Sequence, residues 1–384
     1  MNSVKSFYLE LLRVFAAFYV FIYHVGSETI DNKQYLSNNK YTSFLNLKYS
    51  TAHFFVMIFF VLSGYLITMS ASKPKLTFKS FITFRLGRLY SVLIPALVFS
   101  FTVEFFFKLF NYSIISKIDN ISFPLLRFIL NLFFLGQIGS FCSTPPFNGA
   151  FWSVQYEFIY YVVLGVVLLI RKPYKYFILF LILSLSWLKI LLLLPVWLAG
   201  ACLYYFQNKF ILNKYISLLL FTTTSFFLIY CLFINDSFPF QKSTNENVLF
   251  GYVLFFSWNF LADYLFALIV FFNLYSFFQL SDSLIHGFDK SRMFLFLYKK
   301  IKIIGNCSYT LYLFHTPLLF LFATIFPYNR FNNYHILALI LLVLITVFFI
   351  ARLTEWKISF WRNIVSDCIE VLLKSVKKIK SPSV

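Results

Sequence analysis

The sequence predicts an all-α, polytopic integral membrane protein with about ten transmembrane helices. Of its 384 residues, 60% are hydrophobic and only 12% are charged, a composition that ordinary soluble domains do not have. The apolar residues gather in long runs, and a helix needs about 20 such residues to cross a bilayer. The 33 Lys and Arg residues cluster in alternate connections between these runs. Together these observations exclude a soluble domain.

Ten segments are predicted to span the membrane. The fifth and sixth are short and are joined almost directly around Lys189, so one bent hairpin is an alternative for this pair. The apolar segment 122–140 contains Pro124 and Arg127, and we predict an interfacial or re-entrant helix there. The ten predicted spans are 7–25, 51–72, 87–109, 149–170, 175–189, 191–207, 212–234, 251–279, 303–326 and 335–353.

The distribution of basic residues predicts the orientation. With the N-terminus in the cytoplasm, 23 of the 33 Lys and Arg residues fall on the cytoplasmic side and nine on the opposite side, with Arg13 inside the first span. This is the positive-inside asymmetry of membrane proteins, and it places both termini in the cytoplasm. We therefore expect a multi-pass protein of the cell inner (plasma) membrane. The net charge of +19 follows from this topology, so no nucleic-acid partner is predicted.

One transmembrane domain, residues 1–356, is predicted to be followed by a basic cytoplasmic tail, residues 357–384. The tail contains the run LLKSVKKIK, which can lie on anionic membrane lipid. The five cysteines have neither metal-ligand nor redox spacing, so we predict no metal site and no disulfide framework. The sequence carries no prediction of oligomeric state.

The first span holds an arginine and a histidine, Arg13 and His24, eleven positions apart. At 3.6 residues per turn this separation is close to three turns, so both side chains project from one side of the helix. An arginine in a span costs roughly 2.5–3.5 kcal/mol on insertion scales. Structural roles are possible for each, because Arg13 could form an ion pair and His24 could cap the helix at the headgroups. Their shared face favours a helix that lines a polar interior.

The second and third spans carry polar residues with different predicted roles. The pair Ser63-Gly64 permits close helix approach, and packing is the favoured interpretation. His53, at the outer end of the second span, could be a second polar lining group or an interface histidine, and the latter is favoured. Arg85 and Arg88 are three residues apart and share a helix face at the cytoplasmic mouth of the third span. Their guanidinium groups suit phosphate, although topological anchoring alone would also explain them.

The fourth span opens with FWSVQYE, in which Ser153 and Glu157 are four residues apart, as are Trp152 and Tyr156. A glutamate inside a span needs a partner. The predicted topology puts Glu157 at the same membrane face as His24, where a carboxylate could orient the imidazole and raise its basicity. A buried structural pair with another helix is the alternative.

The ninth span contains Tyr309, Tyr312 and His315 at three-residue spacing. Tyrosines at this spacing are more often packing residues than catalytic ones, whereas His315 lies near the middle of the membrane and is harder to assign to packing. At the end of the last span Glu355 follows Arg352, and we predict a local salt bridge between them.

Taken together, these motifs resemble those of the acyltransferase-3 family of integral-membrane acyltransferases, nearly from end to end. Members typically move an acetyl group from acetyl-CoA to a sugar hydroxyl of a surface glycan, such as a polysaccharide or lipopolysaccharide. Two features depart from the family pattern: the acidic residue that often precedes the FFVLSG run is missing, and Glu355-Trp356-Lys357 replaces Glu-Lys-Pro. The motifs that carry the resemblance are Arg13 and His24; Ser63 and Gly64; Arg85 and Arg88; Trp152, Ser153 and Glu157; and Ser308, Tyr309, Tyr312 and His315.

The resemblance implies an enzyme that binds acyl-CoA from the cytoplasm and acylates a surface or lipid-linked glycan. Histidine has an unperturbed pKa of about 6.5, so His24 suits a general base; an acyl intermediate on His24 and a longer acyl group both stay open. The rival interpretation is a glycan or lipid-linked sugar transporter (flippase), which needs no arginine pair for nucleotide phosphates. The predicted site residues are His24, Glu157 and Arg13 for catalysis, Arg85 and Arg88 for the donor, and Ser153, Tyr156, Tyr309, Tyr312 and His315 along the substrate path.

Overall fold

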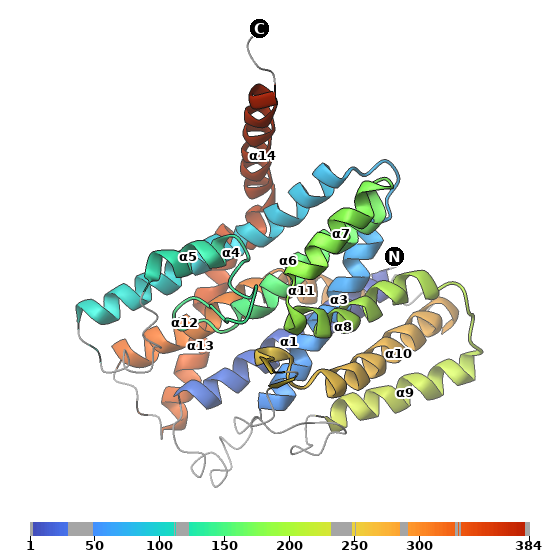
Figure 1. Cartoon of the computed structure of the whole chain (residues 1–384). Coiled ribbons are helices and arrows are strands. Elements are labelled where there is room, and N and C mark those ends of the chain that lie inside the picture. Colours follow the sequence, from blue (N-terminus) through green and yellow to red (C-terminus); the bar gives the residue numbers. More distant parts are fainter. Residues whose placement is uncertain are drawn as a thin grey trace.

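The structure is a computed structural model that describes residues 3–29, 49–110, 112, 123–231, 248–249, 251–284, 291–326, 329 and 332–380. Helices form almost all of its regular structure (Figure 1). The helices are α1 Ser3–Thr29, α3 Tyr49–Ala71, α4 Phe78–Leu109, α5 Pro124–Leu132, α6 Phe151–Leu169, α7 Tyr174–Leu185, α8 Leu188–Phe206, α9 Lys214–Tyr230, α10 Phe260–Leu284, α11 Arg292–Gly305, α12 Ser308–Ile325, α13 Asn333–Leu353 and α14 Ile358–Lys380. Two short 3₁₀ helices, η4 Phe255–Ser257 and η6 Glu355–Lys357, and an antiparallel strand pair, β1 Val248–Leu249 with β2 Tyr252–Val253, complete the order.

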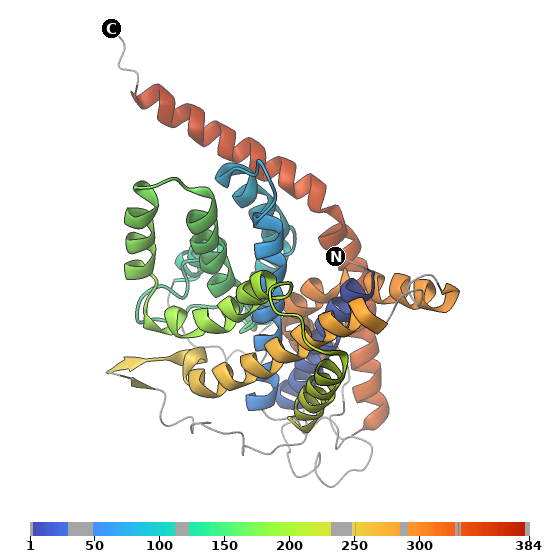
Figure 2. The same cartoon turned by 90° about the vertical axis from the view of Figure 1, so that its right-hand side faces the viewer.

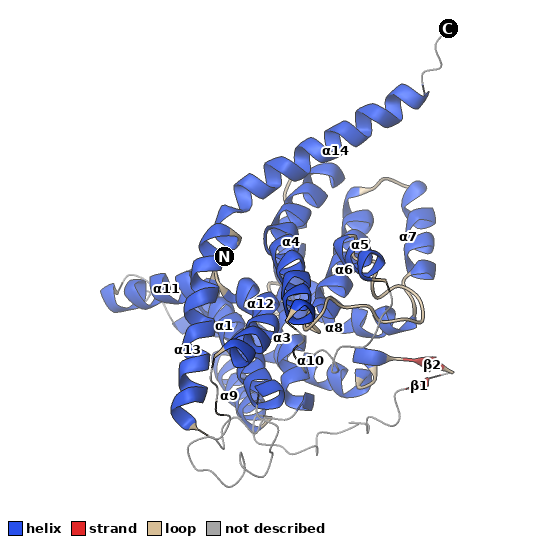
Figure 3. Ribbon diagram, turned by 90° about the vertical axis from the view of Figure 1, so that its left-hand side faces the viewer, coloured by secondary structure: helices blue, strands red, loops and turns tan. Residues whose placement is uncertain are grey.

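The predicted fold class is confirmed: the chain is an all-α, polytopic membrane protein. Among the described residues, eight helical stretches are long and apolar enough to cross a membrane, and α7 and α9 are shorter apolar helices. Each of the ten predicted spans therefore corresponds to a helix. The predicted span 251–279 began too early, because β2 and η4 occupy residues 252–257 and α10 begins at Phe260. Figures 2 and 3 show the first turn of α1 on the same side of the bundle as α14, in agreement with termini that share one side.

Two glycines bring α3 and α8 into direct contact. A Cβ atom on Gly64 would lie 2.0 Å from the carbonyl oxygen of Trp197, and one on Gly200 would lie 1.9 Å from the carbonyl oxygen of Val61. The helices therefore approach closely only because both positions lack a side chain. This confirms the packing interpretation of the Ser63-Gly64 pair.

Helix α4 carries the two predicted donor arginines and is the longest helix in the described part of the chain. Its N-cap is Thr77, whose hydroxyl accepts a hydrogen bond from the Ser80 N–H. At Gly87, α14 packs directly on α4, since a Cβ atom there would lie 2.8 Å from the Cα of Arg362. The segment predicted as a basic tail is thus helical through Lys380 and is anchored on α4 (Figure 2).

Helix α5 occupies the first part of the segment predicted to be interfacial or re-entrant, whose residue 122 lies outside the described residues. Pro124 stands in its first turn, where its missing N–H costs nothing. Arg127 is buried and donates to the Thr144 carbonyl oxygen. The opposite face is apolar and exposed at Leu125 and Ile129, as expected of a helix that lies against lipid.

Candidate active site

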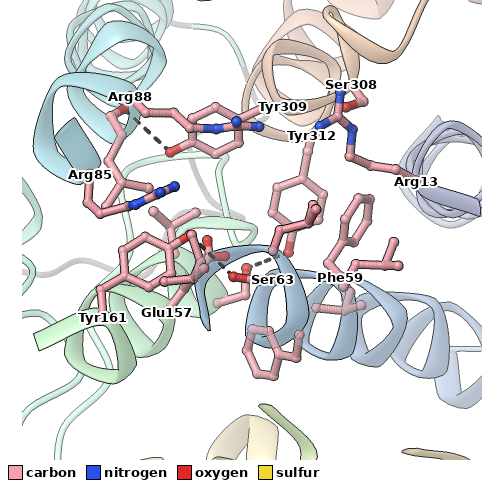
Figure 4. Close-up of a pocket in the computed structure, with 18 residues that line it drawn as sticks. Arg13, Phe59, Ser63, Arg85, Arg88, Glu157, Tyr161, Ser308, Tyr309 and Tyr312 are labelled. Carbon is pink, nitrogen blue, oxygen red and sulfur yellow. Dashed lines mark hydrogen bonds between the residues drawn. The ribbon is translucent and has the colours of Figure 1, made fainter. Parts of the chain in front are cut away.

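A pocket of about 120 Å³ lies where five helices meet, α1, α3, α4, α6 and α12 (Figure 4). Its polar side chains converge on one interior space from positions far apart in the sequence. Such convergence in a membrane interior is costly and marks a functional site. The polar lining residues are Arg13, Ser63, Arg85, Arg88, Ser153, Glu157, Tyr161, Ser308, Tyr309 and Tyr312.

Seven of the ten predicted site residues line this pocket, and three do not. The three outside it are His24, Tyr156 and His315. The seven that line it are Arg13, Arg85, Arg88, Ser153, Glu157, Tyr309 and Tyr312.

The two arginines of α4 differ in how many of their guanidinium donors are already hydrogen-bonded within the protein. Arg85 donates a hydrogen bond to the Ser70 hydroxyl and lies 5.6 Å from the centroid of the Phe81 ring. Arg88 lines the pocket and its side chain donates no hydrogen bond to any residue that the structure describes. Arg88 therefore offers its fork of donors to a ligand, and Arg85 offers part of its own.

Glu157 lies between α3 and α4 rather than beside His24. It is within hydrogen-bonding reach of the Ser63 and Tyr161 hydroxyls, and its carboxylate interacts electrostatically with the α4 arginines. The Trp197 indole also donates to Ser63, at 3.2 Å. The predicted pairing of Glu157 with His24 is wrong, because α6 packs on α3, α4 and α7 whereas α1 packs on α3, α11 and α12. That two spans end at the same face of the membrane does not by itself make them neighbours.

Arg13 is held at the α11–α12 side of the pocket. Its guanidinium lies 2.8 Å from the Glu10 carboxylate and donates to the Gly305 carbonyl oxygen at 2.5 Å. In the same pocket lining, the hydroxyl of Ser153 on α6 and the phenol of Tyr312 on α12 are 2.7 Å apart. The pocket wall thus joins α1, α6, α11 and α12 through polar contacts.

The two histidines form a pair beyond this wall. The rings of His24 and His315 have centroids 5.0 Å apart, and the Tyr312 ring lies 6.2 Å from that of His315. His315 Nδ1 is 3.0 Å from the Leu311 carbonyl oxygen; because a carbonyl only accepts, we assign the hydrogen to Nδ1. Its Nε2 is then an acceptor, and it is buried without a hydrogen-bond partner among the described residues.

Comparison with known proteins decides the family. The sequence model of the acyltransferase-3 family, described as an acyltransferase domain, matches residues 6–353. The chain belongs to the acyltransferase-3 family. It is therefore a multi-pass membrane acyltransferase, and the resemblance seen in its motifs is confirmed. No curated protein and no solved structure shows significant similarity to it.

Two acidic residues near the pocket of the acyltransferase were not predicted as site residues. Glu10 stands three residues before Arg13, a spacing that places both on one helix face. Glu355 is buried and accepts hydrogen bonds from the N–H and the hydroxyl of Thr310, both at 3.1 Å. The predicted salt bridge of Glu355 with Arg352 is wrong: the turn at Thr354 directs Glu355 inward toward α12, while Arg352 lies over the ring of Phe348.

Two other predicted residues of the acyltransferase belong to its core. Tyr156 is buried, with its hydroxyl 3.4 Å from that of Ser257. The interpretation of His53 as an interface histidine is wrong, because it is buried and its Nε2 lies 3.2 Å from Asp263. The ring of His53 stacks on Trp152 at 5.8 Å. These contacts hold the start of α6, and with it Ser153, in place.

The acyltransferase thus combines a cation-rich pocket with a histidine pair behind it. The pocket supplies guanidinium donors for an anionic ligand and hydroxyl groups for a carbonyl. The histidine pair supplies groups that can accept and return a proton. Within the described residues, no group of three or more His, Cys, Asp or Glu is arranged to hold a metal ion.

Proposed function

We propose that this acyltransferase moves an acetyl group from acetyl-CoA to a hydroxyl of a surface or lipid-linked glycan. The observation that carries the proposal is the gathering of three arginines, Arg13, Arg85 and Arg88, around one pocket within a membrane domain. Glu10 already pairs with Arg13, whereas no described residue accepts a hydrogen bond from the Arg88 side chain, and this free guanidinium favours an anionic ligand. Family membership favours acyl transfer over the transporter alternative.

The phosphates of the donor would be held by Arg85 and Arg88. Both arginines come from the N-terminal half of α4, which the charge distribution places on the cytoplasmic side of the plasma membrane, where acetyl-CoA is supplied. Arg88 contributes the larger share because none of its side-chain donors is engaged within the described part of the chain. The small volume of the pocket supports a short acyl group.

The acceptor would approach from the opposite side, where His24 is reachable. The side chain of His24 is 24% exposed, whereas His315 is completely buried. In the proposed step His24 removes the proton of the sugar hydroxyl as that oxygen attacks the thioester carbonyl. The carbon–sulfur bond then breaks, the CoA thiolate leaves and takes up a proton, and the glycan carries the new ester. Arg13 would position the donor rather than touch His24.

Mass spectrometry of the surface glycan tests the proposal. Cells that lack the gene are complemented with the wild type, with Arg88→Ala, or with Lys172→Ala as a control in the exposed connection between α6 and α7. We expect the acetyl mass increment with the wild type and the control, and its loss in the empty strain and with Arg88→Ala. A glycan of equal mass in the empty and wild-type strains would overturn the proposal, and a heavier increment would replace acetyl by a longer acyl group.

A further inference from the structure

A second cavity, of about 400 Å³, opens between α1, α11, α12 and α13. Its lining is apolar almost throughout, with Phe18 on one side, Ile304 and Leu311 on the next, and Leu344 and Phe348 on the third. We call it the α1–α13 groove. It is separate from the pocket that holds the arginines, since only Ser308 lines both.

The groove lies within the membrane-spanning part of the chain. Three of its four helices, α1, α12 and α13, are long and apolar enough to be spans. Water gains no hydrogen bonds in an apolar cavity, whereas a hydrocarbon chain fills it without loss. The surrounding solvent consists of lipid, so an acyl chain is the group that this cavity accommodates.

Basic side chains border the groove at one end. Arg352 lies with its guanidinium 4.8 Å from the centroid of Phe348, a groove residue. Lys299 and Lys300 stand four residues before Ile303 and Ile304, which line the groove, and therefore share their helix face. All three basic residues are exposed, and none of them pairs with a carboxylate among the described residues.

Helix α11 has the pattern of a helix that lies in the membrane interface. Met293 and Phe296 are 71% and 60% exposed, although they are apolar. Lysines follow them within two turns, and Lys300 sits 5.4 Å over the Phe296 ring. An exposed apolar face with lysines beside it is typical of helices at an anionic lipid surface. Figures 2 and 3 show α11 projecting sideways from the bundle.

We propose that the α1–α13 groove binds one anionic phospholipid. An acyl chain occupies the groove, and the phosphate headgroup lies among Lys299, Lys300 and Arg352. Basic pockets between transmembrane helices on the cytoplasmic side select anionic headgroups in this way. The lipid also supports the donor site, because α11 ends at Gly305, whose carbonyl oxygen receives the hydrogen bond of Arg13. The binding itself does not depend on the identity of donor or acceptor.

Native mass spectrometry of the purified protein tests the headgroup. Phosphatidylglycerol and phosphatidylcholine with identical acyl chains are titrated in the same detergent. We expect the wild type to bind phosphatidylglycerol at least about tenfold more tightly than phosphatidylcholine. The triple variant Lys299→Gln, Lys300→Gln, Arg352→Gln should lose affinity for phosphatidylglycerol by about fivefold per removed charge. The control Lys172→Gln, Lys175→Gln also removes lysines that stack on an aromatic ring and should bind like the wild type. Equal affinity for both lipids, or a triple variant that binds like the wild type, would overturn the proposal.

A pair of tryptophan variants tests the groove. Leu344→Trp fills the cavity, whereas Leu341→Trp, one turn earlier, places the same side chain at a site that is 49% exposed and outside it. Leu344→Trp should lose both lipids, and Leu341→Trp should retain them. Thermal unfolding checks that each variant is folded. Retention of phosphatidylglycerol by a folded Leu344→Trp protein would also overturn the proposal.

Discussion

The imidazole rings of His24 and His315 lie with centroids 5.0 Å apart, on α1 and α12. Two histidines that are 291 positions apart in the sequence thereby form one cluster between the arginine pocket and the exposed edge of His24. Only His24 is accessible from outside the bundle. The geometry thus distinguishes an accessible imidazole from a buried one that contacts it.

The first prediction concerns these histidines. Purified His24→Ala should lose acyl transfer by about a hundredfold or more while acetyl-CoA still binds, because the base is lost and the donor pocket is not. His24→Gln should not rescue, since an amide cannot carry the proton. His315→Ala should lose less, because His315 is buried and contacts His24, whereas the proposed step uses His24 alone. Transfer rates of folded variants measured in parallel decide the roles. Near-normal transfer by His24→Ala would make His315 the base.

The second prediction concerns the donor arginines. Arg88→Ala should raise the Kd for acetyl-CoA roughly ten- to a hundredfold, since each charge-assisted hydrogen bond contributes about 1.5–3 kcal/mol. Arg85→Ala should cost less, because part of its guanidinium is engaged by Ser70. Arg88→Lys should recover only part of the affinity, because lysine restores the positive charge but not the planar pair of N–H donors. Calorimetry in detergent measures each constant, with Lys172→Ala as the control. If both alanine variants bind like the wild type, the arginines are topological anchors only.

The structure supports two predictions that came from the spacing of residues within one helix. Spacing within α4 placed Arg85 and Arg88 on one face, and both line the pocket. Ser63-Gly64 indicated close packing, and Gly64 contacts α8. Local periodicity determines such features, since 3.6 residues per turn fixes which side chains share a side.

Predictions of which side chain pairs with Glu157 and with Glu355 failed, because the partner of a buried charge is decided by tertiary packing. Glu157 reaches Ser63 and Tyr161 instead of His24. Glu355 turns toward Thr310 instead of its near neighbour Arg352, because burial of its carboxylate needs donors that α12 supplies. No pattern in the sequence around Glu355 indicates a partner 45 positions earlier.

The third prediction tests the contact of α3 with α8. Gly64→Ala places a methyl group 2.0 Å from the Trp197 carbonyl oxygen, which forces the helices apart and should cost about 1–3 kcal/mol of stability. Gly149→Ala is the matched control, since nothing lies within 4 Å of its Cβ position. Thermal unfolding in one detergent compares the two. Equal midpoints would mean that α3 and α8 do not approach as closely as described.

The fourth prediction tests the partner of Glu355. Glu355→Ala leaves the buried N–H of Thr310 without its acceptor, so it should cost about 1–3 kcal/mol of unfolding free energy. Glu355→Gln keeps an acceptor and should cost less. Double-mutant cycles give the pairwise term: Glu355 with Thr310→Val should couple, and Glu355 with Arg352→Ala should not. Coupling to Arg352 alone would restore the local salt bridge and contradict the contact of Glu355 with Thr310.

The last prediction concerns orientation, on which the donor side of the proposed reaction depends. Basic residues concentrate beside the N-terminal end of α4 and the connection between α6 and α7, so these regions should face the cytoplasm. Single cysteines at Lys75 and Lys172, both exposed, should therefore resist a membrane-impermeant thiol reagent in intact cells and react after permeabilisation. A cysteine at Ser140, exposed on the other side, should react in both states. Native Cys202 and Cys368 are exposed and are replaced by serine first. Labelling of Lys75→Cys from outside would reverse the orientation, and the arginine pocket would then face away from the supply of acetyl-CoA.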